Sequence, residues 1–276
     1  MIYVKRNLKG VIWHSTAYIS FVFMLIIFIA IIYKVVAMGL PALNLHLLTE
    51  STPPPGVTYG GLLNALVGSL LMVACALVLL IPIGLLTGTY LSLHKHERLS
   101  KFLQFLNDSL LSIPSIIIGL FIYSIVVLTM GHFSAIAGAL ALALVGLPIV
   151  IRGTQDVLTT LPPQLKEAGF ALGAGEVRVV LGILYRSCKA GILSSFFLAL
   201  ARMLGETAPL LFTSLNNQFM SASLTQPIAS LPVTIFQFAM SPDSNWQALA
   251  FAGAVLLMIV ILVLSLLARF LLAKNK

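Results

Sequence analysis

The chain has 276 residues, of which 59% are hydrophobic and only 9% are charged, and its mean hydropathy is +1.06. These values exclude an ordinary water-soluble domain and indicate a protein that crosses a membrane several times. The net charge of +8 would suggest nucleic acid as the partner of a soluble domain, but the basic residues lie in short segments between apolar runs, so no nucleic-acid partner is expected.

Six apolar runs are long enough to cross a hydrocarbon core of about 30 Å. We therefore predict an all-α, polytopic membrane protein whose six transmembrane helices lie near residues 12–38, 62–92, 109–130, 134–151, 190–214 and 247–272. Residues 1–61 then hold the first span and the first outer loop, and residues 62–276 form the core. Only Gly131-His132-Phe133 separates the third run from the fourth, which indicates a tight helical hairpin.

The basic residues indicate how these helices are oriented. All Lys and Arg residues except Lys34 and Arg202 lie in segments that six spans place on one side. Because positively charged loops stay in the cytoplasm, we expect both termini there, in a multi-pass protein of the inner (cytoplasmic) membrane surrounded by lipid. Each outer loop, 39–61 and 215–246, carries a single charge. Residues 227–238 are too apolar for a free loop, and either dip back into the membrane or lie along its surface.

The longest inner segment, about residues 153–189, is where a soluble partner can bind. Pro162 and Pro163 favour the start of a helix, and an apolar stripe follows along it, formed by Leu165, Ala168 and Leu172. Gly173 and Gly175 then permit a sharp reversal before a second apolar stripe. Two short amphipathic helices would form a compact knob that fits a groove on another protein. An ordinary solvated elbow fits the same spacing equally well.

One arginine and one glutamate lie inside the fifth apolar run, at Arg202 and Glu206. A charge at the bilayer centre costs at least a few kcal/mol and usually faces a wet cavity. A spacing of four residues places both side chains on one helix face, about 6 Å apart along the axis. Arg202 offers five donors in a rigid fork that matches a tetrahedral oxyanion, and Glu206 can hold that fork when no anion is bound. A buried ion pair that only joins helices is the alternative.

Two interruptions in the predicted spans add further candidates for such an anion pathway. Gly205 and Pro209 weaken the fifth span beside the charged pair, because proline removes a hydrogen bond four residues back. Ser112 and Ser115 flank Ile-Pro in the third span. Helix breaks at this depth are tolerated chiefly where they line a cavity. Thr207, Ser112 and Ser115 are therefore candidate pathway residues, although small hydroxyl residues also serve to pack helices.

Patterns that indicate catalysis are missing from the sequence. There is no Gly-x-x-x-x-Gly-Lys-Ser/Thr loop, so the chain is not expected to bind ATP and must obtain its energy from a partner. No His-Glu-x-x-His or Gly-x-Ser-x-Gly pattern is present. His94 and His96, in a basic inner loop, fit a solvated patch better than a metal site. We expect no enzyme activity, no metal and no bound cofactor.

The inner segment resembles a loop of known function. Glu167-Ala168-Gly169, followed by Gly173, is similar to the cytoplasmic EAA loop of ABC importer permeases, although Gly169 replaces the alanine of that pattern. In that family the loop docks on the ATP-hydrolysing subunit and carries motion into the membrane. The resemblance therefore implies that Glu167, Ala168, Gly169 and Gly173 couple this chain to an ATPase.

Four further motifs extend the resemblance along the chain, at residues 113–121, 147–152, 205–211 and 227–232. Together and in this order they resemble the PstA-type permeases of phosphate ABC importers. The resemblance implies a type I importer permease fold, with residues 62–276 as the permease core, and a chain that forms half of a phosphate pathway. It also implies a related PstC-type permease, two copies of a PstB-type ATPase that uses ATP, and a PstS-type phosphate-binding protein.

Two other functions remain open on the sequence. Within transport, the alternative is a permease for another tetrahedral oxyanion, such as sulfate, molybdate or a phosphonate, because the same guanidinium chemistry suits them all. Outside transport, the alternative is a membrane scaffold or sensor in which the charged pair only holds helices together.

Overall fold

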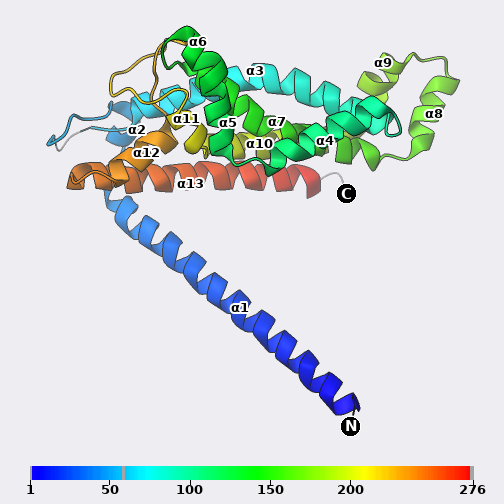
Figure 1. The fold of residues 1–276 in the computed structure, drawn as a ribbon, viewed down its shortest axis with the longest axis horizontal. Helices are drawn as coiled ribbons and strands as arrows, with labels where there is room; N and C mark the ends of the chain where they lie inside the picture. Colours follow the sequence, from blue (N-terminus) through cyan, green and yellow to red (C-terminus); the bar gives the residue numbers. More distant parts are fainter. Residues whose placement is uncertain (1, 58–59, 274–276) are drawn as a thin grey trace.

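The computed structural model describes residues 2–57 and 60–273, with the backbone alone for residues 2–12. Every regular element in these ranges is helical, which confirms the predicted class (Figure 1). Five helices are long and apolar enough to cross a membrane, or six when one bent helix pair is counted as a span. Several of the basic residues used to predict orientation lie outside the described side chains, namely Lys5, Arg6, Lys9, Lys274 and Lys276.

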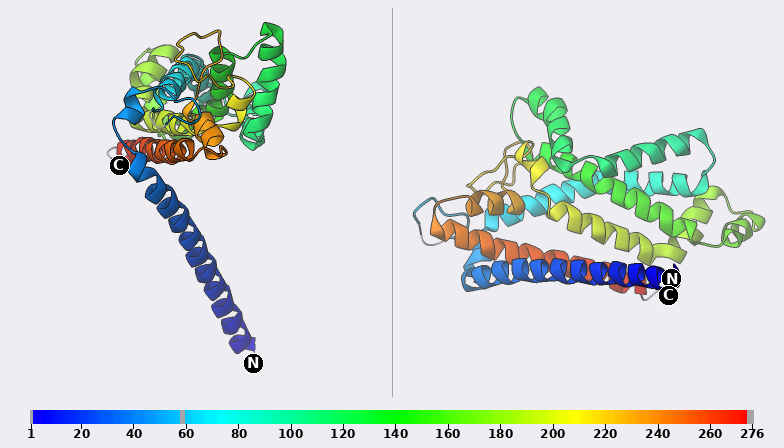
Figure 2. Two further views of the ribbon diagram at one scale, coloured as in Figure 1. Left: turned by 90° about the vertical axis from the view of Figure 1, so that its left-hand side faces the viewer. Right: turned by 60° about the horizontal axis from the view of Figure 1, so that its bottom comes forward.

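Helix α1 (Ile2–Gly39) stands away from the other helices along most of its length (Figures 1 and 2). It is followed by the 3-10 turn η1 (Leu40–Ala42) and the short α2 (His46–Thr49). It contacts the last helix, α13 (Ser244–Ala273), near its C-terminal end, where a Cβ on Gly39 would lie 2.5 Å from the carbonyl oxygen of Phe251. From Trp13 onward, α1 exposes mainly apolar side chains, which suits a membrane interior.

Three long helices form the centre of the molecule. Helix α3 (Leu63–Leu93) packs along α7 (Ala135–Thr159), and α10 (Tyr185–Leu204) packs on both α7 and α13. Small residues permit the close contacts: a Cβ on Gly88 would lie 2.7 Å from the carbonyl oxygen of Ile151. Such approaches are typical of membrane helices, which associate by packing rather than by the hydrophobic effect. The buried core between these helices includes Met72, Leu80, Leu142, Val150, Ala199 and Met203.

The third predicted span, 109–130, is bent at the Ile-Pro interruption that the sequence indicated. The chain forms an amphipathic helix, α4 (Arg98–Ser112), and then α5 (Ser115–Ile122), which continues through a π-helical turn, η2 (Tyr123–Val127), into α6 (Leu128–Met130). The two halves meet at an angle of 106°. Pro114 sits at this bend, where it has no N–H for the carbonyl four residues back and disfavours a helical conformation of the residue before it.

The tight hairpin predicted at residues 131–133 is confirmed. Gly131 ends α6 with a φ of +75°, and Ser134 begins α7 by accepting a hydrogen bond from the N–H of Ala137 at 3.2 Å. The fourth predicted span ends too early, however, because α7 continues past residue 151 to Thr159. Arg152 therefore lies within a long helix and not in a loop.

The segment between α7 and α10 forms a projecting pair of helices, which we call the knob. It consists of α8 (Pro163–Ala171), the turn at residues 172–175 and α9 (Glu176–Val179). Pro163 lies in the first turn of α8, and Gly173 reverses the chain with a φ of +75°, as predicted. The second helix is not separate, however, since α9 runs through the π-helical turn η3 (Val180–Leu184) into α10. The fifth predicted span, 190–214, is therefore wrong at both ends: the continuous helix covers Glu176–Leu204.

The opposite end of the molecule, which we call the loop end, is built from residues 40–57, 60–62 and 212–244 (Figure 1). It carries α12 (Leu231–Ala239), and the short α11 (Ala208–Leu211) leads into it. The apolar segment that begins at Pro227 is buried in protein: Ile228 and Ala229 are each 1% exposed. Burial by the protein itself provides the cover that such backbone requires in a membrane. The C-terminal end of α13 lies on the knob side of the molecule, whereas α1 diverges from the other helices and its N-terminal end lies well away from the knob (Figures 1 and 2).

Asp243 ties the two loops of the loop end together. Its Oδ2 accepts a hydrogen bond from the N–H of Gly56 at 2.8 Å, and its Oδ1 accepts from the N–H groups of Asn245 and Trp246 in the first turn of α13. The bonds from Gly56 and Trp246 lower the pKa of Asp243 below its ordinary value, and partial burial acts in the opposite direction. Asn245 adds a second link, because its Nδ2 donates to the carbonyl oxygen of Val57 at 2.8 Å.

Candidate functional site

The charged pair lies at a break in the helix and not on a continuous turn. Helix α10 ends at Leu204, and the N–H of Gly205 closes the last turn by bonding to the carbonyl oxygen of Arg202 at 3.2 Å. The chain begins α11 at Ala208, three residues after Gly205, with Pro209 in the first turn. Arg202 therefore belongs to the last turn of α10, whereas Glu206 follows the end of that helix.

The two side chains form an ion pair with unequal surroundings. Arg202 Nε lies 2.8 Å from Glu206 Oε1, the distance of a charge-assisted hydrogen bond. The side chain of Glu206 is 7% exposed, whereas that of Arg202 is 56% exposed. A buried carboxylate thus holds the guanidinium from behind, and the outer side of the guanidinium is open.

This arrangement can bind an anion reversibly. The open side of Arg202 offers N–H donors in a planar fork, which matches two oxygens of a tetrahedral oxyanion. Glu206 neutralises the arginine when no anion is bound, which limits the energy of burying a charge. When an anion arrives, the negative charge of Glu206 opposes it and keeps binding weak enough for release.

The second predicted interruption meets the first. Helix α5 packs directly on α11, and a Cβ on Gly119 would lie 2.6 Å from the Cα of Pro209. Ser115 is the first residue of α5 and lies one turn before Gly119, on the same helix face. The bend at residues 113–114 and the break after α10 are therefore neighbours in the structure, although the sequence separates them widely.

Ser112 and Thr207 lie in other surroundings. Ser112 is exposed at the end of α4, and its hydroxyl donates to the carbonyl oxygen of Asp108 at 2.9 Å. Thr207 lines an apolar crevice of about 680 Å³ beside α1 and α13, together with residues such as Phe28 and Met258. Arg202 does not line that crevice. Of the predicted pathway residues, the structure thus joins Arg202 to Glu206 and places Ser115 at the start of α5, the helix that packs on α11.

A second cluster of charges, formed by Arg152, Asp156 and Asp108, was not predicted from the sequence. Arg152 Nε lies 3.4 Å from Asp156 Oδ1, and its Nη1 lies 3.7 Å from Asp108 Oδ1 on α4. All three side chains are roughly half exposed, and the cluster links α4 to α7. The spacing of four residues between Arg152 and Asp156 was a readable signal, but the early end predicted for the fourth span assigned both to a loop.

The residues predicted to contact an ATPase lie on the knob. Glu167 and Ala168 are exposed on α8, whereas Gly169 is buried against the following helix. A Cβ on Gly169 would lie 2.9 Å from Cδ1 of Ile183 and 3.0 Å from Cγ2 of Val179. The glycine that departs from the EAA pattern therefore permits α8 to pack closely on η3 and α9.

The surface of the knob is apolar for an exposed segment. Leu172 is 88% exposed and Val177 is 72% exposed, and both flank the reversal at Gly173. An open hollow of about 850 Å³ lies beside them and is bordered by Arg178 and Arg186. Exposed apolar side chains on a projecting element indicate a docking surface for another protein.

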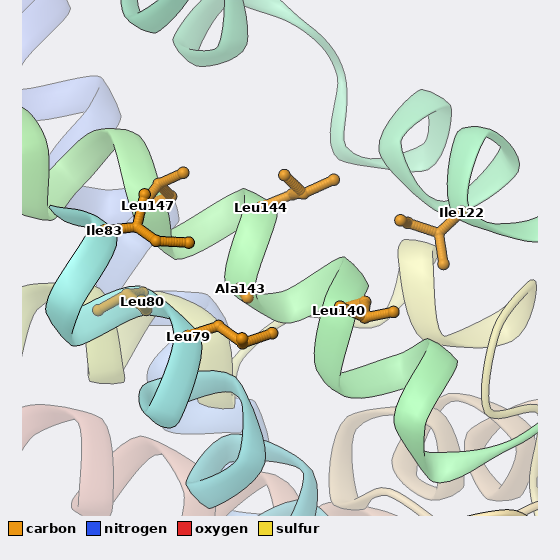
Figure 3. A pocket seen from close by; sticks show the side chains of 8 residues that line it. All are labelled: Leu79, Leu80, Ile83, Ile122, Leu140, Ala143, Leu144 and Leu147. Atoms are coloured by element: carbon orange, nitrogen blue, oxygen red, sulfur yellow. The ribbon is translucent and has the colours of Figure 1, made fainter. Parts of the chain in front are cut away.

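The pocket between α3, α5 and α7 offers nothing to an anion. Its volume is about 220 Å³, and Figure 3 shows that all eight side chains around it are hydrocarbon, for example Leu79, Ile122 and Leu144. Such walls provide no donor for an oxyanion. In the part of the chain that the structure describes, no group of three His, Cys, Asp or Glu residues is placed to hold a metal ion.

Comparisons with known proteins agree with this arrangement. Residues 80–276 match the family described as binding-protein-dependent transport system inner membrane component. The phosphate transport system permease protein PstA of Yersinia pestis is 49% identical over 89% of this chain and 84% of its own length. PstA of Haemophilus influenzae is 48% identical, covering 92% and 90%, and PstA 1 of Mycobacterium tuberculosis is 32% identical, covering 95% and 88%.

The fold also has a solved counterpart. A chain of the MetNI methionine ABC transporter, in an inward-facing conformation, superposes with a TM-score of 0.60 over 77% of this chain and 93% of its own, at 17% identity. At that identity the likeness concerns the fold alone, which is that of a type I ABC importer permease. The sequence matches, at up to 49% identity, also identify the family. By family and by fold, this chain belongs to the PstA permeases of phosphate transport systems, within the binding-protein-dependent inner membrane components.

Proposed function

We propose that this chain is a permease subunit of an ATP-driven phosphate importer and forms half of the route by which phosphate crosses the membrane. The observation that carries the proposal is the geometry at Arg202, an exposed guanidinium at a helix break that is held from behind by the buried carboxylate of Glu206. The names and high identity of its PstA relatives support phosphate as the anion.

Phosphate suits this site because it carries one or two negative charges at neutral pH. Two of its oxygens match the fork of Arg202, and hydrogen bonds to a charged group contribute about 1.5–3 kcal/mol each. Glu206 competes for the same donors, so phosphate binds weakly and can dissociate again. Ser115, at the start of α5 beside the break, is positioned to line the same route.

The helical segment Glu176–Leu204 connects the knob to this site, although it includes the π-helical turn η3 and a kink at Cys188. Its first residues form α9 in the knob, and its last turn carries Arg202. A push on the knob therefore displaces the far end of the same helix, where the chain breaks against α5. In this mechanism ATP binds and is hydrolysed on a partner ATPase, which contacts Glu167, Ala168 and the turn at Gly173, and the route opens alternately to each side of the membrane.

The proposed complex has four kinds of subunit. A related PstC-type permease completes the pathway, two PstB-type ATPase subunits bind at the cytoplasmic face, and a PstS-type protein delivers phosphate at the outer face. The knob and both termini lie on the cytoplasmic side, and the loop end lies outside. The direction of α13 toward the knob and the basic residues on that side support this orientation.

The test is phosphate uptake by the reconstituted complex carrying Arg202→Lys. Lysine keeps the charge but loses the planar fork, so uptake should fall at least roughly tenfold, as expected for one lost charge-assisted hydrogen bond. Arg152→Lys is the matched control, because Arg152 also precedes a carboxylate by four residues but lies in an exposed cluster. Full uptake by the Arg202→Lys complex would contradict the proposed site.

Competition identifies the anion. Unlabelled phosphate should suppress the uptake of labelled phosphate, and the same concentration of sulfate should not. Equal suppression by sulfate would assign the route to another oxyanion. A complex that assembles with its ATPase but shows no ATP-dependent uptake of any oxyanion would indicate a scaffold instead.

A further inference from the structure

A separate cavity lies at the knob-side end of the long helices, away from Arg202. Its volume is about 700 Å³, and its walls come from the last turns of α7 and α13 and the first turns of α10. Val157, Leu161 and Leu272 give it an apolar surface, and Asp156 and Arg269 are its two charged residues. Neither the anion route nor the surface of the knob includes these walls.

The cavity exists because three helices meet and then diverge. A Cβ on Gly191 would lie 2.6 Å from Cγ1 of Val157, so α7 and α10 nearly touch at this level. The hydroxyl of Ser194 donates to the carbonyl oxygen of Ala268 at 2.7 Å and fixes α10 to α13. Nearer the knob, Cys188 departs from helical geometry, with φ −122° and ψ 18°, and α10 turns at this point. The cavity opens on the knob side of that contact.

The two charges stand apart in the cavity. In the part of the chain that the structure describes, no ion pair joins Arg269 to a carboxylate. Asp156 is 61% exposed and uses Oδ1 for Arg152, at 3.4 Å. A positive group and a negative group thus line one cavity without neutralising each other, which is the arrangement that a zwitterionic ligand requires.

The polar walls favour a donor beside Asp156. The hydroxyl of Thr160 donates to the carbonyl oxygen of Val157 at 2.7 Å, and the hydroxyl of Ser187 donates to the carbonyl oxygen of Ile183 at 2.8 Å. Each hydroxyl has its proton engaged within its own helix, so it presents only acceptor lone pairs to the cavity. Two hydroxyl acceptors and a carboxylate suit an ammonium group, whereas Arg269 suits a phosphate.

We propose that this cavity binds the headgroup of an aminophospholipid, with the lipid phosphate at Arg269 and its ammonium group at Asp156, Thr160 and Ser187. The apolar walls, and the position at the end of the membrane-spanning helices, favour a lipid over a free anion, because Leu161 and Leu272 can contact the start of an acyl chain. Free phosphate would meet the negative charge of Asp156 and would leave those walls uncovered. Basic pockets between transmembrane helices at the cytoplasmic face are known lipid headgroup sites.

The site also has a mechanical consequence, which rests on the proposed function. The cavity borders the turn of α10 at Cys188, and this helix is the one that joins the knob to the anion route. A lipid held between α7 and α13 at this level restrains that turn. Occupancy therefore limits how far a movement of the knob bends α10 before it reaches Arg202.

The test measures lipid directly, so it is independent of transport. The intact complex is stripped of lipid in detergent, mixed with micelles of phosphatidylethanolamine, phosphatidylcholine and phosphatidylglycerol in equal amounts, and repurified, and the retained lipids are counted by mass spectrometry. We expect at least fivefold more phosphatidylethanolamine than phosphatidylcholine, whose quaternary ammonium has no N–H to donate. Equal retention of the three lipids would overturn the proposal.

Two variants assign the ends of the headgroup. Arg269→Gln should reduce retained phosphatidylethanolamine at least fivefold, and Asp156→Asn should abolish the preference over phosphatidylglycerol. Lys189→Gln is the matched control, since Lys189 is exposed on α10 at the same level but does not line the cavity. Wild-type retention by both variants would overturn the site, and displacement of the lipid by inorganic phosphate would identify a free-anion site instead. The Arg202→Lys complex should retain lipid normally even where its uptake fails.

Discussion

The loop end is tied by hydrogen bonds between segments far apart in the sequence, whereas the knob is joined to α7 by residues 160–162 and to α10 by an irregular helix, and it packs through an apolar cluster that includes Leu158, Val179 and Leu184. At the loop end, the indole N–H of Trp246 donates to the carbonyl oxygen of Pro53 at 3.2 Å. The side-chain amide of Asn64 donates to the backbone carbonyl oxygen of Gln218 at 3.1 Å. At the knob, α8 reaches the rest of the molecule mainly by packing on α9 and η3. Hydrogen bonds between distant segments thus hold the loop end, whereas helix packing holds the knob.

This difference indicates where movement enters the molecule and where it is resisted. A π-helical turn and the turn at Cys188 lie between the knob and the straight part of α10, and irregular turns of this kind often occur at functional sites. The cross-linked loop end resists the same displacement. The break at Gly205, between a movable end and a fixed end, is where the strain must be taken up, and this is where Arg202 and Glu206 lie.

Removal of the arginine at this break should have the largest effect. Arg202→Ala leaves the buried carboxylate of Glu206 without its hydrogen-bond partner, which costs about 3 kcal/mol, the upper end of the range for an unsatisfied buried group, because Glu206 is charged. We expect a large fall in the unfolding temperature of the purified complex. The double variant Arg202→Ala/Glu206→Ala should regain much of that stability but none of the uptake, because the anion still lacks its guanidinium.

The exposed arginine cluster provides the comparison. Arg152→Ala removes contacts to Asp156 and Asp108 that are roughly half exposed, and such pairs contribute only about 0–1 kcal/mol. Its unfolding temperature should therefore remain close to that of the unaltered complex. Equal destabilisation by Arg202→Ala and Arg152→Ala would show that the break is no more dependent on its charges than the cluster is.

The contact between the two helix interruptions gives the next largest effect. Gly119→Ala places a Cβ 2.6 Å from the Cα of Pro209, and backbone atoms cannot move aside as a flexible side chain does. Overpacking of this kind costs about 1–3 kcal/mol. We expect a lower unfolding temperature and slower uptake, measured on the same preparation. Gly205→Ala is the control at the same break, because its nearest neighbour would be 3.6 Å away, and it should be close to neutral.

Two glycines with the same conformation allow the knob to be compared with a hairpin outside it. Gly131, in the hairpin before α7, and Gly173, in the knob, both have φ +75° and open space where a Cβ would lie. Alanine at either position is strained by the same conformation, at about 1–2 kcal/mol. Only Gly173→Ala should reduce the ATPase activity stimulated by phosphate-loaded binding protein. Equal losses from both variants would show that the knob has no special part in coupling.

The sequence predicted those features that depend on local chemistry. The hairpin at Gly131 and the reversal at Gly173 follow from glycine at positions where a short connection needs a positive φ. The ion pair of Arg202 and Glu206 follows from their spacing. The class of the protein follows from long apolar runs, since the bilayer leaves few other structures that satisfy the backbone.

Features that depend on distant contacts were not predictable in the same way. Pro114, and Gly205 with Pro209, mark the two interruptions in the sequence, but they do not show that the chain bends by 106° at the first or that the two breaks face each other. Arg152 finds Asp108 only because α4 folds back along α7. The burial of Gly169 likewise depends on the return of the chain through Val179. Periodicity reports which residues avoid water, but it does not report which helix covers them.

The smallest expected effect concerns Asp243 and the acid stability of the loop end. Its pKa in the folded protein lies below the unfolded value of about 3.9, because the N–H groups of Gly56 and Trp246 bond to the charged carboxylate. The stabilisation is therefore fully present above that unfolded value and is lost as the pH falls through the folded pKa. Asp243→Asn should lower the unfolding temperature at pH 7, and the difference from the unaltered protein should shrink below about pH 4.

The hydrogen bond from Asn245 to Val57 is a control that distinguishes the titration of Asp243 from a general weakening of the loop end. Asn245→Ala removes the hydrogen bond to Val57, which joins the same two segments but carries no titratable group. Its unfolding temperature should stay below that of the unaltered protein by a similar amount at every pH. If the Asp243→Asn difference is equally constant with pH, the carboxylate charge contributes nothing, and the loop end is held by neutral hydrogen bonds and packing alone.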